Sequence, residues 1–198
     1  MPKMVSLLLA AGHSSRMGQP KALLEWNQQP LILHQIKMLQ TLGYPVAVVL
    51  GAHERIIGAQ LKDQQILSVS HPNYDAGMGS SISAGISAIR HLQPEAVLIL
   101  AVDQPLLTST YLKELIDYYQ KNQAGIVQSV STEGWKGIPV IFSERYFDAL
   151  EGLVDDDGAK PVVKKHLDDS LAFTPSNLLT DIDTHTEYQE LKKTTHQS

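Results

Sequence analysis

Residues 5–21 read VSLLLAAGHSSRMGQPK, a short apolar run followed at once by a polar loop that contains two glycines. An apolar run of this length, without alternation, is typical of a strand that is buried on both faces of a parallel sheet. In open α/β sheets, ligands bind at the loops that leave the carboxyl ends of the strands. These residues therefore predict an α/β fold with a binding site directly after its first strand.

The rest of the chain continues this alternation of strands and helices. Short apolar runs predict strands, and amphipathic or capped segments predict helices between them. The predicted strands are 5–10, 46–50, 66–69, 97–101, 126–130 and 138–142, and the predicted helices are 30–42, 80–92, 108–122 and 184–191. This order predicts right-handed βαβ units and a mainly parallel sheet. From about residue 124 the order is less regular, and we expect an added β-region that extends the sheet and covers one side of the pocket.

Composition limits the function. The 198 residues are 43% hydrophobic and 19% charged, which provides a packed core and fits one domain. The absence of cysteine excludes a disulfide scaffold, an iron–sulfur site, a thiol nucleophile and cysteine-ligated zinc. The net charge of −5 argues against a protein that coats nucleic acid, and no apolar run approaches the roughly 20 residues that cross a bilayer. We expect a cytoplasmic monomer that binds neither nucleic acid nor a membrane.

The loop after the first predicted strand has the features of an anion site. Gly12 and Gly18 would let the backbone approach an anion closely and adopt positive φ angles. Arg16 offers a planar fork to a phosphate, and Lys21 offers a compact charge. Neither the P-loop nor the dinucleotide-binding motif is present. A solvated turn with two surface cations stays open as the alternative to phosphate binding.

The pattern Leu-Ala-Ala-Gly-x-Ser-x-Arg-Met-Gly-x-x-Lys over residues 9–21 resembles the signature of the MobA-like nucleotidyltransferases, most closely that of the molybdenum cofactor cytidylyltransferases. The resemblance extends over about residues 5–191. It implies a three-layer α/β sandwich with a Rossmann-like central sheet, of the nucleotide-diphospho-sugar transferase type. It further implies a single domain over residues 1–198, with a nucleotide-binding part at about 1–122 and an acceptor-side extension at about 123–198.

A second glycine-rich segment, GMGSSISAG at residues 77–85, opens a predicted helix. Backbone N–H groups and serine hydroxyls at a helix start can hydrogen-bond a base or a phosphate. From the residues alone, an N-cap followed by a helix face of small residues is favoured, and a serine-hydrolase elbow is disfavoured because its first glycine is missing. The resemblance implies that this segment helps to bind the base and ribose. The nucleotide-binding residues that it implies are Leu9, Ala10, Ala11, Gly12, Arg16, Lys21, Gly77, Met78, Ser80, Ser81 and Gly85.

Acidic residues mark two places along the chain. Asp103 follows the strand predicted at 97–101, so it lies at the same sheet edge as the first loop. Near the C-terminus, Asp181 and Asp183 alternate and would point to one side of a short strand. Turn and capping aspartates are the alternative at both places. The resemblance implies that Asp103, with Asp181 or Asp183, holds Mg²⁺, which takes one or two carboxylates together with phosphate oxygens and water. Which of these two aspartates binds the metal stays open.

Two other segments resemble the acceptor side of the family. Ile138 lies where the family's Gly-His-Pro or Gly-Asn-Pro strand has a polar residue. Residues 155–160 read DDDGAK and resemble a Gly-Asp-x-Gly-Ala-Arg element, with Asp156 at the acid and Lys160 in place of the arginine. A solvated acidic turn is an equally open interpretation of the three aspartates.

The resemblance implies transfer of a nucleotidyl group from CTP to the phosphate of molybdenum cofactor, giving molybdopterin cytosine dinucleotide and pyrophosphate. Arg16, Lys21 and Asp103 are the implied catalytic residues, because positioning and charge neutralisation supply most of the catalysis of such a transfer. Three alternatives stay open. They are a GTP-dependent guanylyltransferase, a cytidylyltransferase that acts on another phosphorylated acceptor, and a non-catalytic chaperone that hands molybdenum cofactor to a recipient molybdoenzyme. The guanylyltransferase branch usually ends its first loop in Gly-Gly-x-Asp-Lys, which residues 18–21 lack.

Overall fold

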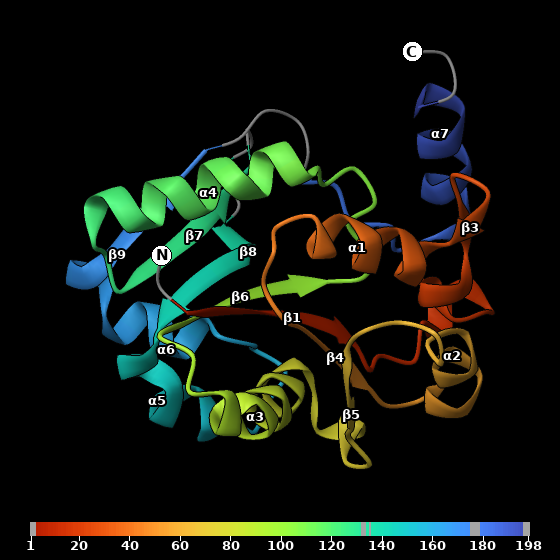
Figure 1. The fold of residues 1–198 in the computed structure, drawn as a ribbon. Helices are drawn as coiled ribbons and strands as arrows, with labels where there is room; N and C mark the ends of the chain where they lie inside the picture. Colours follow the sequence, from red (N-terminus) through yellow and green to blue (C-terminus); the bar gives the residue numbers. More distant parts are fainter. Residues whose placement is uncertain (1–2, 132–133, 135, 175–178, 196–198) are drawn as a thin grey trace.

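The computed structural model describes residues 3–131, 134, 136–174 and 179–195, and it contains a seven-stranded sheet between two layers of helices (Figure 1). The strands are β1 (Met4–Ala10), β4 (Val46–Leu50), β5 (Leu67–Ser70), β6 (Ala96–Ala101), β7 (Ile126–Val130), β8 (Lys136–Ser143) and β9 (Ser170–Phe173). Their spatial order is β5-β4-β1-β6-β8-β7-β9. The predicted α/β class and mainly parallel sheet are confirmed, and the expected β-region after residue 124 is formed by β7, β8 and β9.

Strand direction determines where a site can form. β1 pairs in parallel with β4 and β6, β4 pairs in parallel with β5, and β7 pairs in parallel with β9. Among the described strands of this sheet, β8 alone runs in the opposite direction, antiparallel to β6 and β7. The chain passes from β1 outward to β4 and β5 and then returns to β6 on the other side of β1. The strand order therefore reverses beside β1, and ligands bind at the carboxyl ends of strands at such a reversal.

Helices cover both faces because the central strands are buried along their whole length. The helices are α1 (Leu31–Gln40), α2 (Glu54–Gln60), α3 (Met78–Ile89), α4 (Ser109–Asn122), α5 (Phe147–Glu151), α6 (Lys160–Lys165) and α7 (His185–Thr195). α1 and α4 lie on one face, and α3, α5 and α6 lie on the other (Figure 1). None of the described helices has the length and apolar character that a bilayer crossing requires.

The boundaries of α1 and α3 differ from those predicted. Pro30 does not begin α1; it lies in the short strand β3 (Gln29–Pro30), which pairs with β2 (Glu25–Trp26), and α1 ends before the predicted boundary, at Gln40. α3 begins before Ser80, at Met78, because Gly77 has a φ of 100° and turns the chain directly into the helix. Such a φ is open to glycine and strained for other residues.

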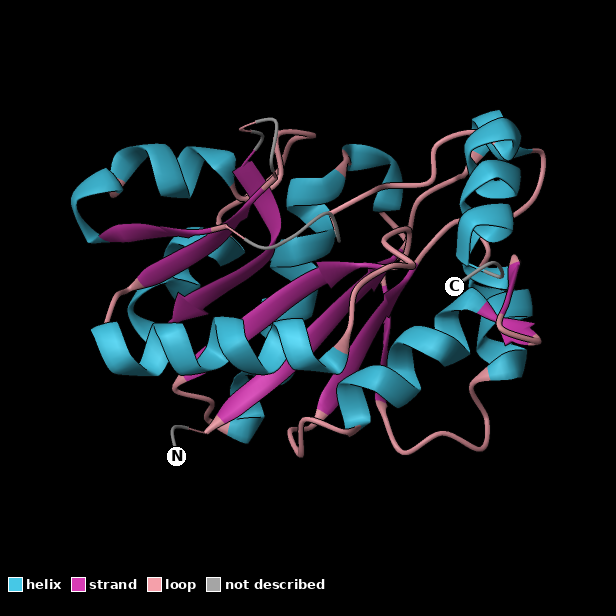
Figure 2. Ribbon diagram, turned by 90° about the horizontal axis from the view of Figure 1, so that it is seen from above, coloured by secondary structure: helices cyan, strands magenta, loops and turns pink. Residues whose placement is uncertain are grey.

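The capping box predicted for the last helix is confirmed. Glu187 Oε2 accepts hydrogen bonds from the backbone N–H groups of Asp183 and Thr184, each at 2.8 Å, and Thr184 Oγ1 accepts from the Glu187 N–H at 3.3 Å. The helix extends past the predicted end to Thr195. The buried Tyr188 donates its hydroxyl hydrogen to the Glu25 carbonyl at 2.6 Å, which holds α7 beside the β2–β3 hairpin (Figure 2). These contacts fix the start of α7.

Candidate functional site

A cavity of about 540 Å³, here called the first cavity, opens at the carboxyl ends of β1 and β6. Register places Leu9 of β1 beside Ala101 of β6, so the loops that follow these strands leave the sheet side by side. The segment after β5 and the start of α3 form the opposite wall. Of the implied nucleotide-binding residues, those that line the first cavity are Leu9, Ala10, Ala11, Gly12, Lys21, Gly77, Met78 and Ser81.

The loop after β1 is held in shape by its own hydrogen bonds. Ser14 has a left-handed backbone conformation, its carbonyl accepts from the Met17 N–H at 2.9 Å, and its hydroxyl oxygen accepts from the Lys21 N–H at 3.0 Å. Gly18 has a φ of 67°, as expected. The side chain of Arg16 lies outside the part of the chain that the structure describes. The expectation of a positive φ at Gly12 is wrong.

Gly12 has a different reason to be glycine. A Cβ built on Gly12 would meet no atom within 4 Å, and the residue lines the first cavity. A side chain here would thus occupy cavity space that glycine leaves open to a ligand.

Lys21 joins two aspartates that are distant in sequence. Its Nζ donates to Asp103 Oδ2 at 2.9 Å and to Asp183 Oδ1 at 2.7 Å. Burial lowers the pKa of Lys21, but the charges and hydrogen bonds of Asp103 and Asp183 outweigh it and raise this pKa above its ordinary value. The ammonium group is therefore charged at neutral pH, and it fixes three separate chain segments at one point.

The two C-terminal aspartates flank a buried anchor. Ile182 is fully buried, and its N–H donates to the Asp103 carbonyl at 2.9 Å. Asp181 and Asp183 lie on either side of it and both keep exposed surface, in line with the expected alternation, but the short strand expected here is wrong because this segment has no strand pairing. Asp183 lines the first cavity, whereas Asp181 lines a neighbouring one. The two aspartates thus serve different cavities.

Asp181 is held by Gln104, which is fully buried and donates from Nε2 to Asp181 Oδ1 at 2.9 Å and to the Ile138 carbonyl at 3.2 Å. Enclosure by protein raises the pKa of the Asp181 carboxyl, and the negative charges of Asp103 and Asp183 raise it further against the opposing hydrogen bond. The three carboxylates are therefore close enough to repel one another.

The glycine-serine segment is pressed against residues 155–156. A Cβ at Gly77 would lie 2.7 Å from Asp156 Cα, and one at Gly79 would lie 2.6 Å from the Asp155 carbonyl oxygen. Asp156 Oδ1 accepts from the Met78 N–H at 3.3 Å, so a carboxylate from far along the chain caps the start of α3. Asp156 is thus part of the site rather than of a detached acidic turn.

Ser80 and Gly85, two of the implied nucleotide-binding residues, lie elsewhere. The Ser80 hydroxyl donates to the Gly77 carbonyl at 2.7 Å and hydrogen-bonds His71 Nε2 at 2.9 Å, and it does not line the first cavity. A Cβ at Gly85 would lie 2.6 Å from Leu7 Cδ2 and 3.0 Å from Val49 Cγ2. Gly85 therefore serves the close packing of α3 on β1 and β4.

Sequence reasoning missed the His13–Asp75 pair at the rim of the first cavity. The His13 ring hydrogen-bonds the Asp75 carboxylate and meets the Tyr74 ring edge-on, with centroids 5.1 Å apart. His53 Nε2 donates to the His13 carbonyl at 3.0 Å. These contacts join the loops after β1, β4 and β5. All three residues follow strand ends, which was the available signal, but nothing in their spacing indicates that they meet.

A second cavity of about 380 Å³ adjoins the first and shares four lining residues with it, namely Met78, Ala101, Asp103 and Asp156. Its walls come from the start of β8, from α6 and from residues 156–160. Apolar side chains make up much of the lining, and Lys136, Lys160 and Lys164 carry the positive charge. Among the described residues that line it, Gln128 alone is polar and uncharged. Asp103 lies where the two cavities meet.

The aspartates suit a divalent cation. Asp103 and Asp183 offer carboxylate oxygens at the wall of a cavity, and the charge of Asp181 is close enough to act on both of them and on Lys21. The described residues contain no group of three or more His, Asp or Glu side chains arranged around one point. Mg²⁺ is commonly held by one or two carboxylates together with substrate phosphates and water, which is the mode that this pair of carboxylates fits.

Comparison with known proteins places this chain in a family. A model of the MobA-like NTP transferase domain matches residues 6–170. The chain belongs to the MobA-like NTP transferase family. It is a nucleotidyltransferase by this membership, and its α/β sheet is the one typical of that fold.

The chain is also similar to individual proteins and solved structures. The chain is 28% identical to the purine catabolism protein PucB of Bacillus subtilis, over 97% of both chains. It is 31% identical to the molybdenum cofactor guanylyltransferase of Pseudomonas fluorescens, over 73% of this chain and 70% of that protein. The crystal structure of Rv0371c from Mycobacterium tuberculosis superposes with a TM-score of 0.85 at 22% identity, over 97% of this chain and 98% of that one. A manganese complex of Rv0371c is also among the similar structures, with a TM-score of 0.77 and 22% identity over 96% of this chain and 98% of that one.

Proposed function

We propose that this MobA-like nucleotidyltransferase transfers the cytidylyl group of CTP to the terminal phosphate of molybdenum cofactor and releases pyrophosphate. The observation that carries the proposal is the meeting of two unlike cavities at Asp103. The first is built from glycine-containing loops and one lysine. The second combines apolar walls with three lysines and four aspartates, so its cations and its acidic groups lie side by side. Such a pair suits two anionic substrates whose reacting groups must come together at one point.

The first cavity takes the nucleotide. Backbone N–H groups of the loop after β1 and of the start of α3 reach base, ribose and phosphates, and Gly12 leaves room for them. Lys21 neutralises the triphosphate and the departing pyrophosphate. Because the Ser14 hydroxyl accepts a hydrogen bond from the Lys21 N–H, the Lys21 side chain extends from a fixed backbone position. Arg16, from the same loop, is proposed to assist it.

The second cavity takes the acceptor. A cavity for a sugar or polyol phosphate needs neutral polar side chains that hydrogen-bond hydroxyls, and Gln128 is the single such residue among the described lining. Apolar walls from Ile138, Val140 and Val163 suit a flat ring system, and Lys160 and Lys164 suit its phosphate. Molybdenum cofactor, a pterin with a terminal phosphate, matches this combination better than a polyol phosphate does.

The transfer itself needs positioning more than acid–base chemistry. An oxygen of the acceptor phosphate attacks the α-phosphorus, and the bond from that phosphorus to the bridging oxygen breaks as pyrophosphate leaves. The attacking phosphate monoester is already an anion near neutral pH, so no side chain has to remove a proton from it. Asp103 and Asp183 would hold Mg²⁺, which would neutralise charge on the reacting phosphates. The residues of the two cavities bring both substrates to Asp103.

The choice of CTP over GTP rests on the loop after β1. Its end, Gly-Gln-Pro-Lys at residues 18–21, lacks the Gly-Gly-x-Asp-Lys ending that is usual in the guanylyltransferase branch. A guanylyltransferase is nevertheless among the relatives, so the base must be tested directly.

The test is pyrophosphate release and dinucleotide formation by the purified protein with Mg²⁺ and molybdenum cofactor, in parallel with CTP, GTP, ATP and UTP. We expect turnover with CTP, and a loss of at least about 100-fold in the Asp103→Asn variant. Turnover with GTP alone would overturn the base assignment and keep the reaction. Cofactor binding without pyrophosphate release from any nucleotide would replace the enzyme with a cofactor chaperone.

A further inference from the structure

Lys21 occupies the carboxylates that the proposed function assigns to the metal. Its ammonium group lies 2.9 Å from an Asp103 oxygen and 2.7 Å from an Asp183 oxygen. The Lys21 side chain is 15% exposed and that of Asp103 is 24% exposed, whereas that of Asp183 is 53% exposed, so the Lys21–Asp103 pair is the more enclosed of the two. The protein thus supplies a cation of its own to these two carboxylates.

We propose that Lys21 is an exchangeable counter-ion: it competes with the divalent cation for Asp103 and Asp183 until a triphosphate draws its ammonium group away. This inference rests on the proposed function, because it takes these two aspartates as the cation site. Its consequence is ordered loading. The free protein binds the divalent cation weakly, and nucleotide and cation bind with positive coupling.

The competition follows from distances and charge. A Mg²⁺ ion lies about 2.0–2.1 Å from its oxygen ligands and requires near-ideal octahedral geometry. An ammonium group already bonded to one oxygen of each carboxylate would lie within a few ångströms of that ion. Two cations at that separation repel strongly where water is scarce. Either the ion or Lys21 can hold the two carboxylates, but not both in the present arrangement.

The structure also provides the means of exchange. The Lys21 backbone is fixed by the Ser14 hydroxyl, so the flexible side chain can move without rebuilding the loop. Lys21 itself lines the first cavity, which at about 540 Å³ leaves space beside it for phosphate groups. A triphosphate in this cavity offers charged oxygens to the ammonium group, which can then leave the two aspartates.

The hydrogen bonds from Lys21 to Asp103 and Asp183 also have a structural role. The ammonium group neutralises part of the negative charge of Asp103 and Asp183, and it links the segment before α7 to the loop after β1. The negative charges of Asp103 and Asp183 repel each other, and the ammonium group between them offsets this repulsion. Lys21 therefore helps to hold the two segments together.

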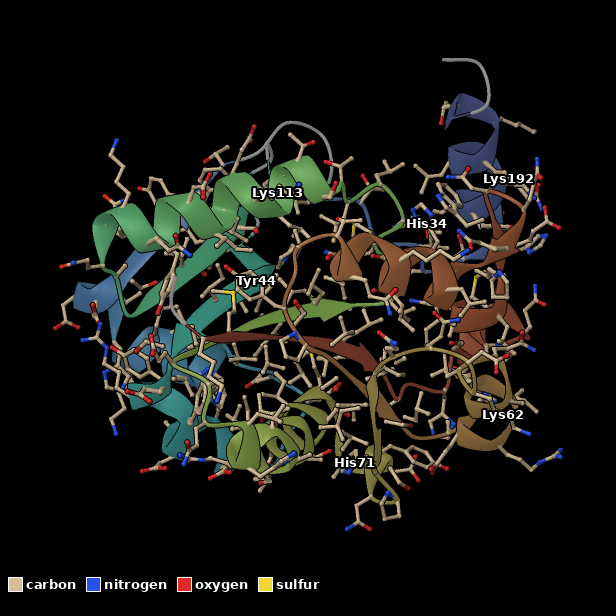
Figure 3. The ribbon with its side chains drawn as sticks, in the orientation of Figure 1. His34, Tyr44, Lys62, His71, Lys113 and Lys192 are labelled. Carbon is tan, nitrogen blue, oxygen red and sulfur yellow. The ribbon has the colours of Figure 1, made fainter. Side chains whose placement is uncertain are left out.

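The experiment measures Mn²⁺ binding to the full chain without nucleotide, from the electron paramagnetic resonance signal of free Mn²⁺. The variant is Lys21→Met, which keeps an unbranched side chain out to the ε position and removes the ammonium group. Lys113→Met is the matched control, because Lys113 is an exposed lysine on α4 and its removal changes the net charge equally (Figure 3). Lys21→Gln is measured in addition, and circular dichroism verifies the fold of each variant.

We expect Lys21→Met to bind Mn²⁺ at least about ten-fold more tightly than the wild type, equivalent to about 1.4 kcal/mol, and Lys113→Met to match the wild type. Adding Asp103→Asn to Lys21→Met should abolish the gain. Unchanged or weaker Mn²⁺ binding in both Lys21 variants would overturn the exchange, even if Asp103→Asn showed that the aspartates bind the metal. A gain that survives Asp103→Asn would instead show that the cation binds elsewhere, and both this inference and the proposed metal site would fail.

Discussion

Two glycines implied for the nucleotide site, Gly12 and Gly85, give opposite predictions when each is changed to alanine. A Cβ at Gly12 meets nothing within 4 Å but enters the first cavity. A Cβ at Gly85 lies 2.6 Å from one methyl group of Leu7 and 2.7 Å from the other, and Leu7 is fully buried. One substitution should therefore affect the ligand and the other the core.

The magnitudes follow from these contacts. Overpacking at Gly85 costs about 1–3 kcal/mol, and the better helix propensity of alanine returns up to about 1 kcal/mol. A net loss of about 1–2 kcal/mol lowers the melting temperature by about 2–8 °C in a chain of this size. Gly12→Ala should change stability by less than about 0.5 kcal/mol. Its methyl group should weaken nucleotide binding by about 10-fold or more, as misfit methyl groups do in tight sites.

Thermal unfolding by circular dichroism and calorimetric titration with CTP and Mg²⁺ measure the two quantities separately. Gly58→Ala is the control, because this glycine is also helical but its Cβ would lie 3.8 Å from Leu50, an ordinary contact. We expect it to raise the melting temperature slightly, through the better helix propensity of alanine, and to leave the CTP affinity unchanged. The packing argument would be refuted if Gly85→Ala kept its melting temperature and lost CTP affinity as Gly12→Ala does. That result would instead support a role for Gly85 in nucleotide binding.

Three further predictions concern charged side chains. Lys164→Met should raise KM for molybdenum cofactor and leave the dissociation constant of CTP unchanged, as steady-state kinetics and calorimetry would show, because Lys164 lines only the second cavity. Asp183→Asn should raise the Mn²⁺ concentration needed for half-maximal rate, whereas Asp181→Asn should mainly raise KM for the acceptor; equal effects on both quantities would refute the division between the cavities. Backbone N–H groups lower the pKa of Glu187 from 4.5, so its contribution to stability is present above that pH and is lost on acidification through its folded pKa. Chemical denaturation at pH 6 and pH 3 should accordingly show a smaller acid-dependent loss in Glu187→Gln than in the wild type.

Much of the fold could be predicted because the central strands are buried on both faces. In β1, β4 and β6 every residue is buried, and Ser6 is the one polar residue among these three strands. β9 has no such signal because it lies at the sheet edge with no fully buried residue. α2 was missed because Ile57 is the one buried residue among its seven, too few for a periodic apolar face.

The residue types of the site could be predicted, but its connections could not. Asp103 was placed correctly by topology, since an acid after a parallel strand lies at the same sheet edge as the loop after β1. The bond of Asp156 to the start of α3 has no sequence signal, because it joins segments whose meeting depends on how the chain after β8 folds back. The same holds for the choice between Asp181 and Asp183, which depends on the burial of Ile182 between them.

The reversed direction of β8 explains why two unlike cavities adjoin. The parallel strands end at this edge of the sheet, so they contribute loops, whose glycines and backbone N–H groups line the first cavity. β8 begins at the same edge, so the side chains at its start line the second cavity. The side chains of α6, further along the chain, line it as well. Loops of small residues suit a constant triphosphate, and exposed side chains suit an acceptor that differs between relatives. Substitutions along β8 and α6 can therefore change the acceptor without moving Lys21 or Asp103, which belong to the other part of the sheet.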